Sequence, residues 1–234
     1  MNNFNEYNPD NFKKVFINSD VYNLVTKKAD IIFWNSFYPT KGYSNNTITP
    51  REFHVNSIVT IAPFYYLQYL TEVNPTSIYD IGCGMNYFKR FFPNIIGIGE
   101  EGDSTFCGDI HDSFNKEFAE KYKNKFESAF SINAIHFVPL TTLRDRIIDF
   151  VSVIKPGGRG FLALNFQRLI EYTTQQDLDM LFPNGITPEV SDRYVREQFD
   201  NISNIKMLCV DIDVNQVTDE WMNGNIRVVF EKLN

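Results

Sequence analysis

An acidic residue and two glycines follow a short apolar segment in the stretch Asp80-Ile-Gly82-Cys-Gly84. The preceding residues, 76–81, are typical of a β-strand, and residues 87–92 are typical of a helix. A strand, a glycine turn and a helix in this order begin many α/β sites for nucleotide-type ligands. Glycine lets the backbone pass close to a ligand, and a helix N-terminus directs free N–H groups toward it. The stretch therefore predicts a ligand-binding loop.

Polar residues also mark the ends of three later predicted strands. They are Glu100 and Glu101 after residues 95–99, Asp109 after 105–107, and Ser131, Asn133 and His136 at the end of 126–132. Ligands of open parallel sheets bind outside the carboxyl ends of the strands. We therefore expect these side chains to gather at one edge of the sheet, where an acid after the second strand could take ribose hydroxyls.

The elements that would position these residues alternate between strand and helix. Further helices are predicted at 112–122, 140–154 and 166–181 and from Thr187, and further strands at 159–165, 206–214 and 226–233. In the helix at 140–154, the inward residues should be Leu143, Ile147, Ile148 and Val151. Lys155-Pro-Gly-Gly158 predicts a tight turn. The last two strands are joined by too few residues for a crossover helix, so they should form an antiparallel hairpin.

This pattern predicts an α/β fold with a doubly wound, mostly parallel sheet of seven strands and helices on both faces. Loop-forming residues at 41–47 separate an N-terminal extension, residues 1–48, from the α/β domain at 49–234. The extension could be a cap over the substrate, an arm that binds a partner, or a decoration of the domain. Among these three, we favour the cap.

Composition excludes several classes of function. The formal net charge is −7 and no block of Lys and Arg occurs, so nucleic acid is not the expected partner. The three cysteines are far apart, which indicates a reducing cytoplasm, and the three histidines lack the spacing of a zinc site, so no metal is expected. No signal peptide or membrane-spanning segment is recognised, and we expect a cytoplasmic protein with no membrane contact. The sequence does not indicate an oligomeric state.

Taken together, residues 55–234 resemble the class I S-adenosylmethionine-dependent methyltransferases. The stretches that carry the resemblance are Asp80-Ile-Gly-Cys-Gly84, Gly97-Ile-Gly-Glu-Glu101, Gly108-Asp-Ile110, Phe126 to His136, and Lys155-Pro-Gly-Gly158 before a strand. The resemblance implies a Rossmann-like fold whose terminal hairpin distinguishes it from NAD-binding domains. It also implies S-adenosylmethionine as the cofactor.

The resemblance further implies a role for each residue of the cofactor site. The loop with Asp80, Gly82 and Gly84 would pass under the methionine part. Glu100 or Glu101 would bind the ribose diol, Asp109 with Ile110 would meet the adenine, and the backbone at Ser131 would reach the methionine amine. Two features depart from the family pattern: Asn86 replaces a third glycine, and the first acid after the second strand comes one residue late. Because Asn tolerates left-handed backbone, we expect the turn to survive.

Methyl transfer is the implied activity, and it requires the acceptor to be aligned with the methyl group and water to be excluded. His136 is the candidate general base and Asn133 a polar contact for the acceptor. The tetrapeptide of amino methylation on adenine or cytosine is absent after residue 130. A small molecule is therefore the first expectation for the acceptor, followed by a sugar and a protein side chain. The alternatives are a noncatalytic binding or structural module of the same fold, for example in a viral particle, and another enzyme that uses the same cofactor.

Overall fold

The computed structural model describes residues 67, 69–84, 86–90, 92–100, 108–200, 202–213 and 225–234. The chain divides into two compact units, Met1–Gln68 and Tyr69–Asn234, and the fold below is that of the second unit. The predicted extension at 1–48 and its boundary, the predicted strand at 105–107, and Glu101 lie outside the described residues.

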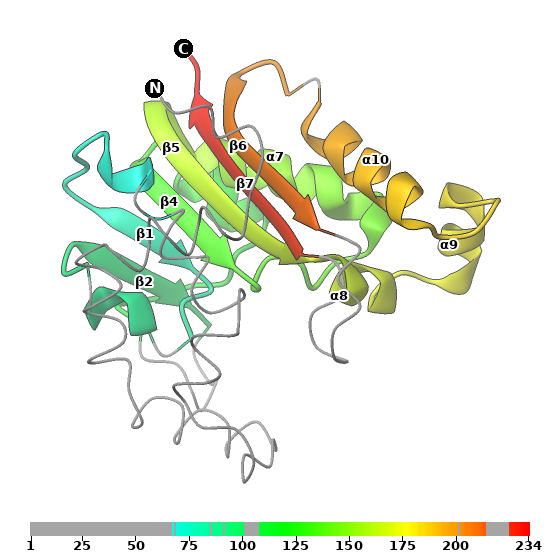
Figure 1. Cartoon of the computed structure of the whole chain (residues 1–234). Coiled ribbons are helices and arrows are strands. Elements are labelled where there is room, and N and C mark those ends of the chain that lie inside the picture. The colour runs from blue at the N-terminus through cyan, green and yellow to red at the C-terminus, as the bar shows by residue number, and fades with distance from the viewer. Residues whose placement is uncertain are drawn as a thin grey trace, which may run out of the picture. The chain divides into compact units, whose positions relative to one another are not determined.

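A single seven-stranded sheet with the order β3-β2-β1-β4-β5-β7-β6 forms the centre of this unit (Figure 1). The strands are β1 (Ile78–Ile81), β2 (Ile95–Gly99), β3 (Ile110–His111), β4 (Phe126–Ile132), β5 (Ile154–Asn165), β6 (Ile205–Asp213) and β7 (Asn225–Lys232). Strands β1 to β5 pair in parallel, whereas β7 runs antiparallel to both β5 and β6. The predicted fold class and its C-terminal hairpin are confirmed.

The helices are shorter and more divided than the sequence predicts. They are η1 (Tyr87–Arg90), α6 (Lys116–Lys121), η2 (Leu140–Thr142), α7 (Leu143–Val153), α8 (Phe166–Glu171), α9 (Gln175–Leu181) and α10 (Pro188–Phe199). Helix α10 begins as predicted, because the Thr187 hydroxyl accepts from the N–H of Val190. The helix predicted at 166–181 is in fact α8 and α9, and Thr174 caps the second of these. The predicted start of α6 at Asp112 is also wrong, because Asn115 is its cap.

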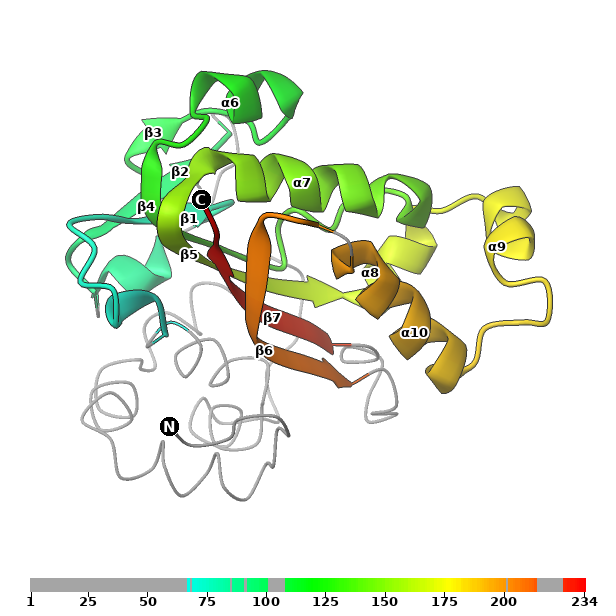
Figure 2. The ribbon, with the colours of Figure 1, turned by 90° about the horizontal axis from the view of Figure 1, so that it is seen from above.

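The apolar core lies between one face of the sheet and the helices α6 and α7 (Figure 2). Helix α7 turns Leu143, Ile147 and Val151 into this core, as predicted. Ile148 is wrongly predicted as inward and is 43% exposed, while Phe150 is fully buried. Helical spacing places 147 and 150 on one face and 148 beside it, at the border of the apolar stripe.

The predicted turn at Lys155-Pro-Gly-Gly158 is built into the start of β5. The register with β4 jumps from Phe126–Ile154 to Ser128–Arg159, so the turn is accommodated as a bulge. Gly157 has a positive φ of 78°. A Cβ at Gly158 would lie 2.4 Å from the carbonyl oxygen of Glu127, so the bulge brings the two backbones too close for any larger residue.

Candidate functional site

The glycine loop after β1 is fixed between the ends of two neighbouring strands. The N–H groups of Gly82 and Cys83 both donate to the carbonyl oxygen of Ile98 in β2, at 2.8 and 3.0 Å. Gly82 has φ 79°, and a Cβ there would lie 2.1 Å from the Cβ of Ala134, which follows β4. Only glycine therefore fits at this position, for reasons of conformation and of space.

Gly84, the second glycine of the loop, has φ 48°, and no atom of the described residues lies within 4 Å of a Cβ built there. Asn86 stands where the resemblance predicts a third glycine, and its φ is 50°. The expectation that Asn keeps the left-handed turn is confirmed. The loop thus presents backbone with an open side at Gly84.

Asp80 is buried beside this loop, with 3% of its surface exposed. It pairs in register with Gly97 and Phe130, so the three residues share the face of the sheet opposite to the main core. Among the described residues, no hydrogen bond or ion pair reaches its carboxyl group. Burial raises the pKa of Asp80 well above its ordinary value, which is the response of a carboxylate that lacks a positive partner.

The Cys83 thiol in the loop is not a nucleophile in this environment. Burial, together with the nearby Asp80 and Asp109 carboxylates, raises the pKa of Cys83 to about 12. A thiol with that pKa is protonated at neutral pH.

Asp109 lies directly before β3, which is Ile110–His111, while the strand at 105–107 that it is predicted to follow lies outside the described residues. Its carboxylate accepts hydrogen bonds from the N–H of Gly97 at 2.9 Å and the Asn86 amide at 3.1 Å, and it pairs with Lys89. Partial burial by itself would raise its pKa, but the bonds from Lys89, Gly97 and Asn86 hold the pKa below its ordinary value. The carboxylate is therefore already engaged by protein donors.

The acid that follows β3 in the structure is Asp112. The sequence pattern does not predict Asp112 at a strand end. Its N–H donates to the carbonyl oxygen of Gly99 at 2.9 Å, and its carboxylate pairs with Lys121 at 2.7 Å. The strand β3 has only two residues, and no periodicity in the sequence reveals so short a strand. Ile110, the predicted adenine contact, is partly buried against the main core.

The helix expected after the glycine loop is a single turn of 3₁₀ helix, η1 (Tyr87–Arg90). Phe88 packs edge-to-face on Phe130, with ring centroids 5.6 Å apart. A turn this short has little of the aligned dipole that long helices offer to phosphates. The structure therefore lacks, at this loop, the N-terminus of a longer helix that the sequence predicts as a donor of N–H groups to the ligand.

Glu100 directly follows β2 and is exposed. It thus stands at the carboxyl end of the strand, although it comes one residue later than the resemblance implies. Its neighbour Glu101 lies outside the described residues.

The end of β4 brings two predicted residues to the same edge. Asn133 has φ 51°, and its N–H donates to the carbonyl oxygen of Ala163 in β5 at 2.8 Å. Ser131 is fully buried, and its hydroxyl has no hydrogen-bond partner among the described residues. The contact that the resemblance implies involves the backbone of Ser131 and does not depend on this hydroxyl.

His136 has the environment of a positioning residue. It is 2% exposed, and its Nδ1 accepts from the N–H of Asn165 at 3.1 Å, which places the proton of the neutral ring on Nε2. Burial, with a smaller effect of the Arg168 charge, lowers the pKa of His136 to about 4. An imidazole with this pKa and an occupied Nδ1 is a weak base, so its assignment as the general base is not favoured by the geometry.

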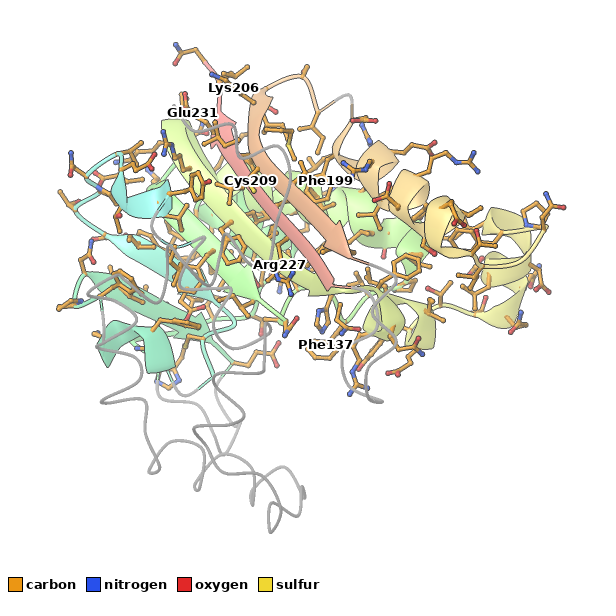
Figure 3. The ribbon with its side chains drawn as sticks, in the orientation of Figure 1. Phe137, Phe199, Lys206, Cys209, Arg227 and Glu231 are labelled. Atoms are coloured by element: carbon orange, nitrogen blue, oxygen red, sulfur yellow. The ribbon has the colours of Figure 1, made fainter. Side chains whose placement is uncertain are left out.

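An aromatic pair continues this edge of the sheet. The Phe137 ring lies against His136 with centroids 4.5 Å apart, and against Tyr172 at 5.6 Å. Both Phe137 and Tyr172 are 50% exposed. Figure 3 shows Phe137 and Arg227 toward one end of β7, with Lys206 and Glu231 toward the other. The first is the carboxyl end of the parallel strands, because Ala163 pairs with Arg227.

The described part of the chain contains neither a cluster of metal-ligating residues nor a membrane-spanning helix. No group of three or more His, Cys, Asp or Glu residues there could hold a metal ion. None of the helices in the described ranges is long and apolar enough to cross a membrane.

Comparison with known proteins gives similarity in structure only. No family profile matches the chain, and no curated protein matches its sequence. A solved protein from Pyrococcus horikoshii is 12% identical with a TM-score of 0.49, and the alignment covers 87% of this chain and 100% of that one.

Two further solved structures are described as S-adenosylmethionine-dependent methyltransferases. One, from Archaeoglobus fulgidus, is 13% identical with a TM-score of 0.48, over 86% of this chain and 100% of that one. The other, from Methanosarcina mazei, is 16% identical with a TM-score of 0.43, over 67% and 92% of the two chains. At identities this low, a statement of function has to rest on the residues of this chain.

Proposed function

We propose that the chain binds S-adenosylmethionine at the carboxyl edge of β1, β2 and β4 and transfers its methyl group to an acceptor. The observation that carries this proposal is the buried carboxyl group of Asp80, which has no positive partner among the described residues. A buried carboxylate is costly unless a cation compensates it. A sulfonium cofactor with an ammonium group brings positive charge to this place.

The same observation argues against a dinucleotide. A pyrophosphate would bring negative charge toward Asp80, and the single turn of η1 offers little dipole to offset the repulsion. Burial is the main cause of the Cys83 pKa of about 12, and the Asp80 and Asp109 carboxylates near the thiol raise the pKa further. The charge of the site therefore favours a cationic ligand.

Asp80, Gly82, Gly84 and the backbone near Ser131 would hold the methionine part, and Glu100 or Glu101 would take the ribose hydroxyls. When bound, the cofactor supplies an electrophilic methyl group. The protein then mainly has to orient the acceptor and exclude water. Asn133 lies where it could contact an acceptor, and His136 would act by holding the loop after β4 against Asn165.

A small-molecule acceptor is the first choice, and a sugar or a protein side chain follows. The net charge of −7 does not favour a polyanionic acceptor. Phe137 and Tyr172 offer half-exposed rings at the same edge, which suits an acceptor with apolar surface.

Titration calorimetry with S-adenosylmethionine, S-adenosylhomocysteine and NAD tests the proposal. The first two should bind and raise the melting temperature, and NAD should do neither. An absence of heat and of thermal shift with both sulfur compounds would overturn it. Mass spectrometry of the reaction products then separates methyl transfer, which leaves S-adenosylhomocysteine, from reactions that leave another thioether.

A noncatalytic module of the same fold is the second candidate. It is favoured by the weak basicity of His136 and by the engagement of Asp109 with protein donors. Cofactor binding without turnover across a panel of small-molecule, sugar and peptide acceptors would support this second candidate.

A further inference from the structure

We propose that Asn86 is a positioning residue, which holds the glycine loop ready for its ligand through a latch formed with Gly97 and Asp109. The identity of the ligand rests on the proposed function. The latch itself belongs to the protein without ligand, so it is open to a separate test.

The backbone of Asn86 closes the loop. Its N–H donates to the carbonyl oxygen of Cys83 at 2.8 Å, and its φ of 50° turns the chain into η1. Asn adopts this left-handed conformation at less cost than most other residues that bear a side chain. A glycine would serve the backbone equally well, so the choice of Asn points to its side chain.

The side chain of Asn86 is packed against β2. The residue is only 7% exposed, and a Cβ on Gly97 would lie 2.6 Å from the Asn86 Cγ. The small residue at 97 thus makes room for the amide. A third glycine in the loop would leave this space unfilled.

Asp109 completes the latch. Its Oδ2 accepts from both the Asn86 amide, at 3.1 Å, and the Gly97 N–H, at 2.9 Å. Its own N–H donates to the Gly97 carbonyl oxygen at 2.9 Å. Asp109 is thereby fixed to the outer edge of β2, and Lys89 pairs with its other oxygen. The amide of Asn86 is anchored to a group that cannot move without breaking the sheet edge.

The loop is therefore held at both ends. Gly82 and Cys83 donate to Ile98 at the first end, and the latch holds the second. Gly84 lies between them with its open side. A loop that is ordered before binding does not lose conformational freedom on binding, and this increases affinity.

A reciprocal exchange of amide and carboxylate tests the latch. In N86D two carboxylates face each other. In N86D/D109N an amide and a carboxylate again face each other, and the amide at position 109 can donate to the carboxylate at position 86. Because Asp109 Oδ2 accepts from both Asn86 and the Gly97 N–H in the native chain, this exchange gives up the bond from Gly97 and the ion pair with Lys89, so the recovery should be partial. The double variant keeps the total charge. N86G keeps the backbone and deletes the amide. N94D is the matched control, because the Asn94 amide donates to the carbonyl oxygen of Pro75 in an exposed turn.

Hydrogen exchange of the protein without ligand is the first measurement. The amides of Gly82 and Cys83 should exchange faster in N86G and N86D than in the native chain. Those of β5 and β7 should be unchanged, N94D should match the native chain, and N86D/D109N should lie between N86D and the native chain. Equal protection of the loop in all variants, or no recovery in the double variant, overturns the inference.

Affinity for S-adenosylhomocysteine is the second measurement. We expect about a tenfold loss in N86D, the size that one charged hydrogen bond gives, and a partial recovery in N86D/D109N. Unchanged affinity in N86D contradicts a role in binding. If the native chain binds no cofactor while loop exchange still responds to the variants, the proposed function fails and the latch stands.

Discussion

Gly82 and Ala134 touch across the ends of β1 and β4, where a Cβ on Gly82 would lie 2.1 Å from the Ala134 Cβ. This contact joins the glycine loop to the loop that carries Asn133 and His136. The two halves of the proposed site, for cofactor and for acceptor, therefore share one packing contact. A change on one side is expected to affect the other.

Gly82→Ala should destabilise the protein through both the clash with Ala134 and the positive φ. Each effect costs about 1–3 kcal/mol. G82A/A134G relieves the clash alone and should recover part of the loss. Gly84→Ala is the matched control, because its φ is also positive but none of the described residues would clash with a Cβ there. Urea denaturation measures all three, and an equal loss in G82A and G84A would contradict the contact.

Asp80→Asn should make the protein more stable at neutral pH and weaken cofactor binding. The folded pKa of Asp80 lies above its ordinary value of 3.8. Its contribution to stability therefore falls as pH rises from about 3.8 through the raised pKa. Removing the charge should therefore stabilise the folded chain at pH 7 and have little effect near pH 4.

The same variant should bind S-adenosylhomocysteine at least about tenfold more weakly, since a hydrogen bond to a charged group contributes about 1.5–3 kcal/mol. Denaturation at several pH values and calorimetry give the two results. A variant that is less stable and binds normally would show that Asp80 is a structural residue only.

His136 should make the fold sensitive to acid. Its pKa falls from the ordinary 6.5 to about 4 in the folded chain, so its stabilising contribution is complete above pH 6.5. That contribution is lost as pH falls toward 4, and its full size is on the order of 3 kcal/mol. H136N should flatten this dependence, and H111N, at an exposed histidine of β3, should leave it intact.

The same histidine can be tested for a positioning role against general base catalysis. In H136N the amide oxygen of the substituted side chain can still accept from the N–H of Asn165, whereas H136A offers no acceptor at all. If His136 positions the loop, H136N keeps most of the turnover and H136A loses it. An equal loss of turnover in the two variants would instead support His136 as the general base.

Arg144 should be among the side chains of α7 that matter most for stability. Its Nη1 donates to the carbonyl oxygens of Glu197, Gln198 and Asp200 at the end of α10, at 3.0, 3.2 and 3.0 Å. R144M should cost about 1.5–3 kcal/mol of unfolding free energy, the range for hydrogen bonds to charged groups. R193M, at an exposed position on α10, should change it by less than about 0.5 kcal/mol. Similar losses in the two variants would contradict this role.

Much of the fold follows from the sequence, because long apolar strands and clear caps leave few alternatives. Strand β2, strand β4 and the start of α10 at Thr187 lie where the pattern predicts them. The sequence does not predict the division of α8 from α9, where the Thr173 hydroxyl donates to the carbonyl oxygen of Leu169 and accepts from the N–H of Leu140, which is far away in the chain. Local pattern does not reveal such a competing hydrogen bond.

The sequence predicts where the candidate site lies better than it predicts the contacts within the site. The place of Asp80 at the end of β1 and the left-handed Asn86 follow from residue type and spacing. The position of Asp109 does not, because β3 has two residues and its pairing with β2 decides which acid stands at the strand end. The burial of His136 and its bond to Asn165 depend on contacts between residues far apart in the chain.

A crystal structure of the chain with S-adenosylhomocysteine tests the central claim most directly. The proposal predicts density for the ligand against Gly82 and Gly84, with the methionine ammonium group within hydrogen-bond distance of the Asp80 carboxylate or bridged to it by one water. Ligand bound elsewhere would contradict the claim. So would a structure with the glycine loop unchanged and no ligand, at ligand concentrations far above those of metabolites.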